Sequence, residues 1–258
     1  MKENSYCIVI PHYQQYENFK AFLPEILKLG ITCIVVDDGS VEKIKKRMRG
    51  RITYLSKKLN CECHLIEHDV NKGKGAAIHT GSRIARNFGF THILQIDADG
   101  QHDAGDINDF IALSKDHPLD IIAGNPIFDQ TVPKERLYGR KVTDFFVAIE
   151  TMSLGIKDSL CGFRLYPLEY FEKVHEDYSI GPRMDFDTDI LVKLVWMEAQ
   201  FRFIDTQVVY LNDDSSHFNY LKDNGRLVWL HTKLLAGLVL QLPNLIKLRL
   251  SGHTALSK

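Results

Sequence analysis

The segment Thr91–His102 reads THILQIDADGQH, and it decides the fold that we expect of this chain. Its first part, His92–Ile96, is a short apolar run that predicts a buried β-strand. Asp97 and Asp99 follow at once, on either side of a small residue. Because alternate side chains of an extended segment project to the same side, these two carboxylates should lie together. Neighbouring carboxylates repel unless a cation lies between them, so the pattern predicts a site for Mg²⁺ or Mn²⁺.

A neutral oxygen ligand for the same cation comes from Gln101, which continues the alternation. The alternative interpretation is a polar turn from strand to loop, with Asp99 and Gly100 at its corner. The neighbouring motifs favour the metal site.

Strands and helices alternate on both sides of this segment. The other predicted strands are Tyr6–Ile10, Ile31–Val36, Glu62–Glu67 and Leu119–Ala123, and the predicted helices lie near 19–27, 41–59 and 74–88. Continuous apolar strands that alternate with helices predict an α/β fold, with a mostly parallel, twisted, Rossmann-like sheet covered by helices on both faces. We expect one catalytic domain over residues 1–211 and an amphipathic helical extension over residues 212–258.

Polar residues follow the first two predicted strands, as Pro11-His12-Tyr13 and as Asp37-Asp38-Gly39-Ser40. In open parallel sheets, ligands bind beyond the carboxyl ends of the strands. We therefore expect Asp37 or Asp38 to bond the base or the ribose of a nucleotide. The alternative is a turn with a helix cap formed by Ser40.

A basic, glycine-rich turn, Asn71-Lys72-Gly73-Lys74-Gly75, opens the next predicted helix. Glycines let backbone N–H groups approach a phosphate, and a helix N-terminus favours anions. The spacing of a Walker A loop is absent. The turn therefore indicates a phosphate or nucleotide contact that does not belong to a P-loop enzyme.

Composition excludes several classes of protein. The chain has 258 residues, 45% of them apolar and 25% charged, which are values of a globular protein. A formal net charge of -1 gives no field that would attract nucleic acid. Five cysteines without a second pair beside Cys61 and Cys63 fit a reducing compartment. With no signal-peptide pattern at the N-terminus, we expect a cytoplasmic protein.

Taken in order, these motifs resemble the family-2 glycosyltransferases of GT-A fold, and most closely the branch that acts on dolichol or polyprenyl phosphate with mannose. Two further segments, Asp158–Arg164 and Phe186–Asp189, continue the resemblance, which covers roughly residues 5–211. It implies a nucleotide-diphosphate sugar as donor and a divalent metal ion.

The resemblance also implies roles for individual residues. The nucleotide sugar is bound by Pro11, Tyr13, Asp37, Asp38, Lys74, Asp97 and Asp99. The metal is bound by Asp97, Asp99, Gln101 and, beyond the last strand, by His217, for which an ordinary surface histidine is the alternative. Basic residues on the acceptor side are Arg136 and Arg140. The catalytic candidates near the acceptor are Asp187, Asp189 and Arg164.

The expected reaction moves a hexose, with inversion, from a donor of the GDP-mannose or UDP-glucose type to a lipid-linked acceptor such as polyprenyl phosphate. If the acceptor is a hydroxyl, Asp187 or Asp189 is the candidate general base. If it is a phosphate, no base is needed. The alternatives are a nucleotidyltransferase of similar fold and a non-catalytic, membrane-associated module that binds sugar nucleotides.

The C-terminal residues 227–250 form a leucine-rich pattern whose uncharged part, Leu234–Ile246, is shorter than the roughly 20 residues of a spanning helix. Flanking Trp229, Lys233 and Lys247 suit a helix that lies on an anionic membrane surface. That would place the protein at the inner face of the cytoplasmic membrane. The alternative is a helix packed on the catalytic domain or in a homodimer.

Overall fold

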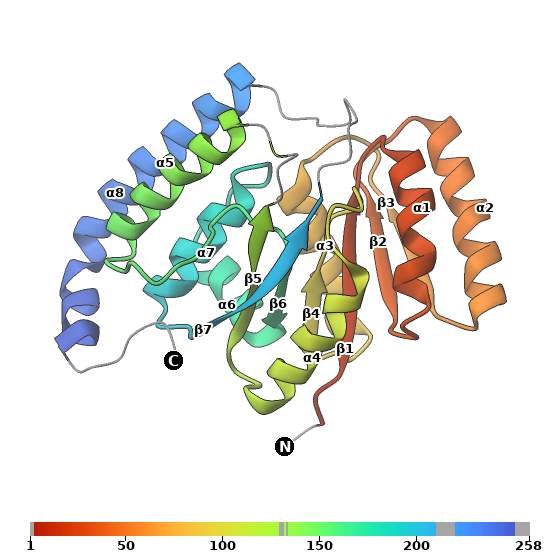
Figure 1. Ribbon diagram of the computed structural model, residues 1–258, viewed down its shortest axis with the longest axis horizontal. Helices are drawn as coiled ribbons and strands as arrows, with labels where there is room; N and C mark the ends of the chain where they lie inside the picture. The colour runs from red at the N-terminus through yellow and green to blue at the C-terminus, as the bar shows by residue number, and fades with distance from the viewer. Residues whose placement is uncertain (1–2, 129–131, 133, 210–219, 251–258) are drawn as a thin grey trace.

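The computed structural model describes the whole chain except residues 1–2, 129–131, 133, 210–219 and 251–258 (Figure 1). Its centre is a seven-stranded sheet in the order β3-β2-β1-β4-β6-β5-β7. The strands are β1 (Tyr6–His12), β2 (Cys33–Asp37), β3 (Cys63–Glu67), β4 (His92–Gln95), β5 (Ile121–Phe128), β6 (Arg164–Pro167) and β7 (Phe201–Val208). Only β6 among them runs antiparallel to its neighbours. The predicted mostly parallel sheet is confirmed.

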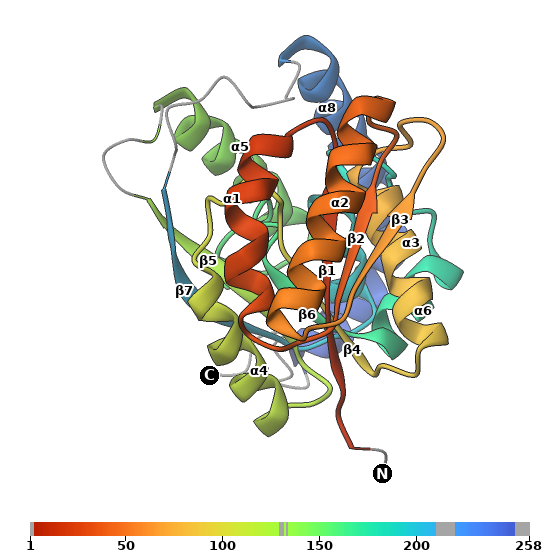
Figure 2. The same cartoon turned by 90° about the vertical axis from the view of Figure 1, so that its right-hand side faces the viewer.

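Helices cover both faces of this sheet, as Figure 2 shows from the side. The helices are α1 (Tyr16–Leu27), α2 (Glu42–Leu59), α3 (Lys74–Asn87), η1 (Ala104–Asp106), α4 (Ile107–Asp116), α5 (Lys134–Glu150), α6 (Leu168–Asp177), α7 (Phe186–Trp196) and α8 (Tyr220–Leu250). Alternate residues of β1 divide between the two layers. Ile8 and Ile10 pack with α1, α2 and α4, whereas Cys7 and Val9 pack with α3, α6 and α7.

The C-terminal helix α8 packs on the same core as the sheet. Leu230, Leu234 and Leu238 are buried in the cluster that contains α7. At Gly237 the two helices approach so closely that an added Cβ would lie 2.9 Å from the ring of Trp196. One face of the predicted extension is therefore part of the catalytic domain's core. No helix in the described parts of the chain is long and apolar enough to cross a membrane.

Strand direction gathers the polar motifs at one edge. The parallel strands β1, β2 and β4 all end there, and β6 begins there because Arg164 is the register partner of Gln95. The first turns of α3 and α7 reach the same edge, where Lys74 and Asp187 meet. The fold thus assembles the candidate site from segments that are far apart in the sequence.

Candidate functional site

A lysine bridge lies at the centre of the site. The Nζ atom of Lys74 donates to Asp97 Oδ2 and to Asp187 Oδ2, each at 2.8 Å. Its side chain is 13% exposed, and that of Asp187 only 5%. Burial alone would lower the pKa of Lys74, but the two carboxylates outweigh it and raise that pKa. The ammonium group therefore stays charged and holds both carboxylates in place.

The sequence interpretation missed two partners of this bridge. Gln95 Nε2 donates to Asp187 Oδ1 at 2.8 Å. At Gly162 an added Cβ would lie 2.5 Å from Lys74 Nζ and 2.9 Å from Asp97 Oδ2, so only glycine leaves room for the ion pairs. A polar residue at the end of a buried strand is a signal that could have identified Gln95. The contact of Gly162 depends on a strand pairing that is not visible in the sequence.

Asp187 is ionised and has a partner on each oxygen. Burial opposes its charge, but Lys74 first and then Arg164 and the bond from Gln95 outweigh the burial and lower the pKa of Asp187. A carboxylate stabilised in this way is a weak base. The geometry therefore favours a positioning role for Asp187 over the role of general base.

The charges of Asp97 and Asp99 interact, but Ala98 and Asp99 form a turn after β4 and not the extended segment from which the pairing was predicted. Burial, and after it the negative charge of Asp97, raise the pKa of Asp99 to about 6. The backbone N–H of Gln101 donates to Asp99 Oδ1 at 3.0 Å and holds the turn in place. The two carboxylates repel each other when both are ionised. A hard divalent cation such as Mg²⁺ or Mn²⁺, bound through their oxygens, would relieve this repulsion.

The protein supplies only part of a coordination shell. No group of three or more histidine, cysteine or acidic side chains in the described residues is arranged to hold a metal ion. The expected histidine ligand, His217, lies outside the described residues. Asp97 and Asp99 would therefore hold the ion together with water and substrate phosphates, which is the usual arrangement for Mg²⁺.

Asp37 is fully buried and bonded inside the protein. Its carboxylate accepts from His12 Nδ1 at 2.8 Å, from the Ser40 backbone N–H at 2.9 Å and from Ser40 Oγ at 2.5 Å. Burial opposes ionisation, but these hydrogen bonds outweigh it and lower the pKa of Asp37. The structure therefore favours a role in shaping the loop after β2 over the direct nucleotide contact expected from the sequence. The Ser40 hydroxyl donates to Asp37 and does not cap α2, whose N-cap residue is Val41.

Asp38 orders the glycine-rich turn. Its carboxylate accepts from the backbone N–H groups of Lys72, at 2.8 Å, and Gly73, at 2.7 Å. His68 completes the arrangement, with Nδ1 at 2.8 Å from Asp38 Oδ1 and Nε2 at 3.0 Å from Thr80 Oγ1. Two of the turn's N–H groups are thus directed at Asp38 and not at a phosphate. His68, which directly follows β3, was missed by the sequence interpretation.

The segment before α7, which contains Pro182 and Arg183, forms hydrogen bonds with this turn. Arg183 Nη1 donates to Asn71 Oδ1 at 2.8 Å, and the backbone N–H of Ala76 donates to Pro182 O at 3.0 Å. Gly73 has φ +108°, and an added Cβ there would lie 2.3 Å from Pro182 O. The glycine is therefore required by the close approach of the two segments.

Two of the predicted catalytic residues are buried and bonded within the protein. Arg164 is fully buried and donates to the backbone carbonyls of Ser159 and Asp187, at 2.8 and 2.6 Å. Asp189 is also fully buried, and pairs with Lys193 at 2.5 Å and with the N–H of Gly181 at 2.7 Å. These contacts favour a structural role over the expected catalytic one: both side chains position the start of α7, and Asp189 lies on the other side of that helix from Asp187.

The predicted acceptor side is formed by α5. Arg140 donates to both oxygens of Asp158, at 2.8 and 2.6 Å, and lies over the ring of Phe128 at 5.0 Å. Arg136 lies one turn earlier on the same helix. Pro11 and Tyr13 are both partly exposed where β1 ends. Pro11 and Tyr13 therefore border the same edge as Lys74.

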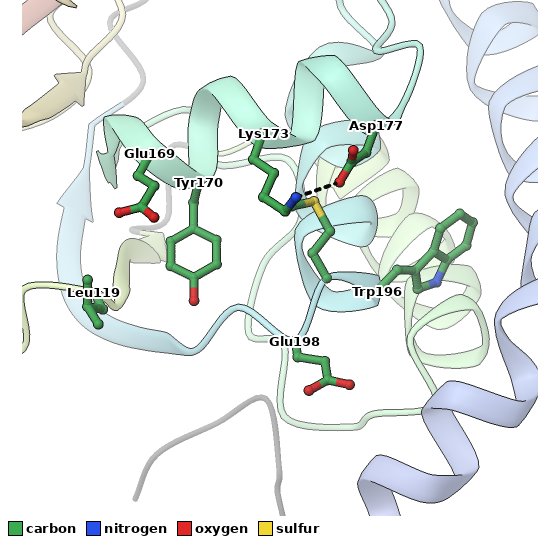
Figure 3. Close-up of a pocket in the computed structure, with 8 residues that line it drawn as sticks. Leu119, Glu169, Tyr170, Lys173, Asp177, Trp196 and Glu198 are labelled. Atoms are coloured by element: carbon green, nitrogen blue, oxygen red, sulfur yellow. Dashed lines mark ion pairs between the residues drawn. The ribbon is translucent and has the colours of Figure 1, made fainter.

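A surface hollow lies at the opposite end of the sheet, near the beginning of β5, and contains none of the predicted site residues (Figure 3). It is lined by Leu119, Glu169, Tyr170, Lys173, Asp177, Trp196, Met197 and Glu198. Its charged groups lie on an open surface, and Lys173 pairs with Asp177 at 3.4 Å. The site residues predicted from the sequence are therefore to be sought at the carboxyl edge and not in this hollow.

Comparison with known proteins agrees with this geometry. A sequence model described as glycosyl transferase family 2 matches residues 7–175. The chain is 26% identical over 203 residues to a dolichyl-phosphate β-glucosyltransferase of Dictyostelium discoideum, which covers 71% of this chain and 60% of that protein. It is 28% identical over 185 residues to an uncharacterized protein of Methanocaldococcus jannaschii, covering 67% and 76% of the two chains. The chain thus spans about 60% of the length of the dolichyl-phosphate glucosyltransferase.

Solved structures confirm the predicted GT-A fold. Staphylococcus aureus TarS in complex with UDP-GlcNAc superposes with a TM-score of 0.60 at 12% identity, covering 89% of this chain and 66% of that chain. Glucosyl-3-phosphoglycerate synthase from Mycobacterium tuberculosis, with Mn²⁺ and UDP-glucose, superposes with a TM-score of 0.59 at 14% identity, covering 92% and 79%.

Proposed function

The chain belongs to glycosyltransferase family 2, and we propose that it transfers a hexose from a nucleotide-diphosphate sugar to the phosphate of a polyprenyl-type lipid. The arrangement that carries this proposal is the pair Asp97 and Asp99 beside the ion-paired Lys74. It offers oxygen ligands for a divalent cation and a fixed positive charge at one edge of the sheet.

Each part of the site has a task in such a transfer. Asp97 and Asp99 would hold Mg²⁺ or Mn²⁺, and the ion would supply positive charge that stabilises the departing nucleoside diphosphate. Lys74 fixes the orientation of Asp97 through its 2.8 Å bond. The turn ordered by Asp38 would border the nucleotide. Relatives named for dolichyl-phosphate glucosyl transfer support a lipid-borne acceptor.

The state of the acidic side chains favours phosphate over hydroxyl as the acceptor group. A hydroxyl acceptor needs a base in contact with it. Asp187 is bonded to Lys74 and Gln95, and Asp189 to Lys193 and Gly181, so neither is free to take a proton. A phosphate is already anionic and can attack the anomeric carbon without that help.

One experiment separates this proposal from its two rivals. The purified protein is incubated with radiolabelled GDP-mannose, UDP-glucose and UDP-N-acetylglucosamine, each with polyprenyl phosphate or with the corresponding polyprenol, in Mn²⁺ or in EDTA. We expect labelled lipid only in the reactions that contain both polyprenyl phosphate and Mn²⁺. In a parallel reaction with added pyrophosphate, label released as sugar 1-phosphate together with a nucleoside triphosphate would support the nucleotidyltransferase. Donor hydrolysis and transfer at background with every donor would support the non-catalytic module.

Because a polyprenyl lipid resides in a membrane, we also propose that the protein works at a membrane surface on the side where nucleotide sugars are present. This follows the lipid-linked acceptors of the relatives. Asp97→Asn serves as the inactive control in the transfer assay, since it removes one proposed ligand while keeping the size of the side chain.

A further inference from the structure

Large apolar side chains are exposed along one side of α5. They are Tyr138, Val142, Phe145 and Ile149, of which Phe145 is 63% exposed. Their spacing of four, three and four residues places them in a single stripe along the helix. The opposite side of α5 faces the core through Thr143 and Val147.

The helix α8 has a second stripe of the same kind. Its buried leucines face α7, while its outward side exposes Val228, Trp229, Val239, Leu240, Ile246 and Leu250. Leu240 is 79% exposed. Single exposed apolar residues are common in proteins, but two such stripes on neighbouring helices mark an interaction surface.

The two helices are held together by buried contacts. His231 Nδ1 lies 2.8 Å from Glu150 Oε1, and the ring of His231 stacks on that of Phe146 with centroids 5.1 Å apart. Figure 1 shows α5 and α8 side by side along one flank, each beginning on the side where the arrow of β5 ends. We name the exposed side chains of the two stripes the α5–α8 face. It borders the acceptor side of the candidate site, where Arg140 lies.

Charge decides which partner suits the α5–α8 face. Exposed Lys141, Lys233 and Lys247 flank the stripes, and the sequence contains no acidic residue after Asp223. Among the side chains described on α5 and α8, the only exposed carboxylate is that of Glu135. A symmetric dimer through this face would bring like charges together, which is unfavourable. Anionic lipid headgroups, in contrast, attract lysines while their acyl chains accept apolar side chains.

We propose that the α5–α8 face binds the surface of a membrane that contains anionic lipids, with both apolar stripes inserted at the level of the headgroups. This rests on the proposed function in one respect, namely that the acceptor phosphate is presented at that surface. Binding by two helices that begin at the catalytic edge would hold this edge close to the headgroups. The predicted interfacial role of the C-terminal helix is thereby extended to α5.

The test is cosedimentation with vesicles of phosphatidylcholine and phosphatidylglycerol in equal parts, and with vesicles of phosphatidylcholine alone. The variant carries Val142→Ser, Phe145→Ser and Ile149→Ser. A matched control carries Val41→Ser, Tyr54→Ser and Val70→Ser, which change equally exposed apolar side chains elsewhere. Thermal unfolding checks that each protein is folded. We expect the partition coefficient on the anionic vesicles to fall at least tenfold for the α5 variant only, and to fall with added salt for the wild type.

Three results would overturn the proposal: no binding of the wild type to anionic vesicles, equal binding of the α5 variant, or a wild-type dimer in light scattering that the variant abolishes without any vesicle binding. The last result would identify a second copy as the partner. Transfer to a detergent-solubilised acceptor is measured separately. Vesicle binding without transfer would reject the proposed function but support membrane binding by the α5–α8 face. Transfer without vesicle binding would support the proposed function but reject membrane binding by this face.

Discussion

Replacing Asp99 with asparagine should make the metal-free protein more stable while removing its response to metal. In the structure, burial and the charge of Asp97 raise the pKa of Asp99 from 3.8 to about 6. A shift of about two units corresponds to at most about 3 kcal/mol of unfavourable free energy when Asp99 is ionised. Asparagine removes the charge and keeps an oxygen that can accept the 3.0 Å bond from the Gln101 N–H. We expect a gain of about 1–3 kcal/mol, or an increase in Tm of about 3–8 °C, at pH 7.5 in EDTA.

The sign of the pH dependence follows from the direction of the shift. Between pH 4 and 6, the folded protein binds more protons at Asp99 than the unfolded chain does, so its stability falls as the pH rises through this window. Below pH 4 the carboxyl is protonated in both states and the loss disappears. The advantage of Asp99→Asn should therefore be fully present above pH 6, smaller at pH 5 and absent near pH 4.

Thermal unfolding at pH 5.0 and pH 7.5, in EDTA and in Mn²⁺, measures both effects. A cation at one hundred times its Kd stabilises a folded protein by about 2.7 kcal/mol, and only the wild type should gain this. Asp69→Asn, a change at an exposed aspartate, is the control. An unchanged or lower Tm of Asp99→Asn in EDTA at pH 7.5, or an equal Mn²⁺ shift in both proteins, would refute the reasoning.

Three further substitutions test the remaining parts of the site. Asp38→Asn should raise the KM for the donor at least tenfold and lower the free energy of unfolding by about 1–3 kcal/mol, because a buried N–H loses a charged acceptor; steady-state kinetics and urea titration measure the two effects. Asp187→Asn should lower kcat with polyprenyl phosphate by no more than about 100-fold and leave the pH profile unchanged, and a larger loss with an altered profile would restore the role of general base. Gly162→Ala should lower kcat more than about tenfold by displacing Lys74, whereas Gly139→Ala, with nothing within 4 Å of its added Cβ, should leave kcat unchanged.

Local pattern predicted strands β1 to β5 and helices α1, α2, α3 and α8, but not the remaining elements. The roles of the side chains depended on long-range contacts. The strands before Asp37 and Asp97 could be predicted because continuous apolar runs end abruptly in polar residues. The antiparallel β6 could not, because four residues beside a cysteine and a glycine give no period to detect. His68 was missed for a similar reason, since its partner Asp38 lies 30 residues away and only strand pairing brings the two together.

The same limit explains why the sequence could not show which acidic residues bind a ligand and which have a structural role. Asp38 and Asp97 both follow a buried strand, and from this position alone each is equally suited to bind a ligand. The hydrogen bonds in the structure distinguish the two. Asp38 accepts from two backbone N–H groups, whereas Asp97 accepts, among the bonds described, from the Lys74 side chain through Oδ2 alone. To bind a ligand, Asp38 would have to leave two backbone donors unpaired, and for the buried N–H of Gly73 this costs about 1–3 kcal/mol. Asp97 can offer Oδ1 to a cation while Oδ2 keeps its bond with Lys74. Substitutions at Asp38 should therefore act on donor binding through the shape of the turn, and those at Asp97 on the transfer step itself.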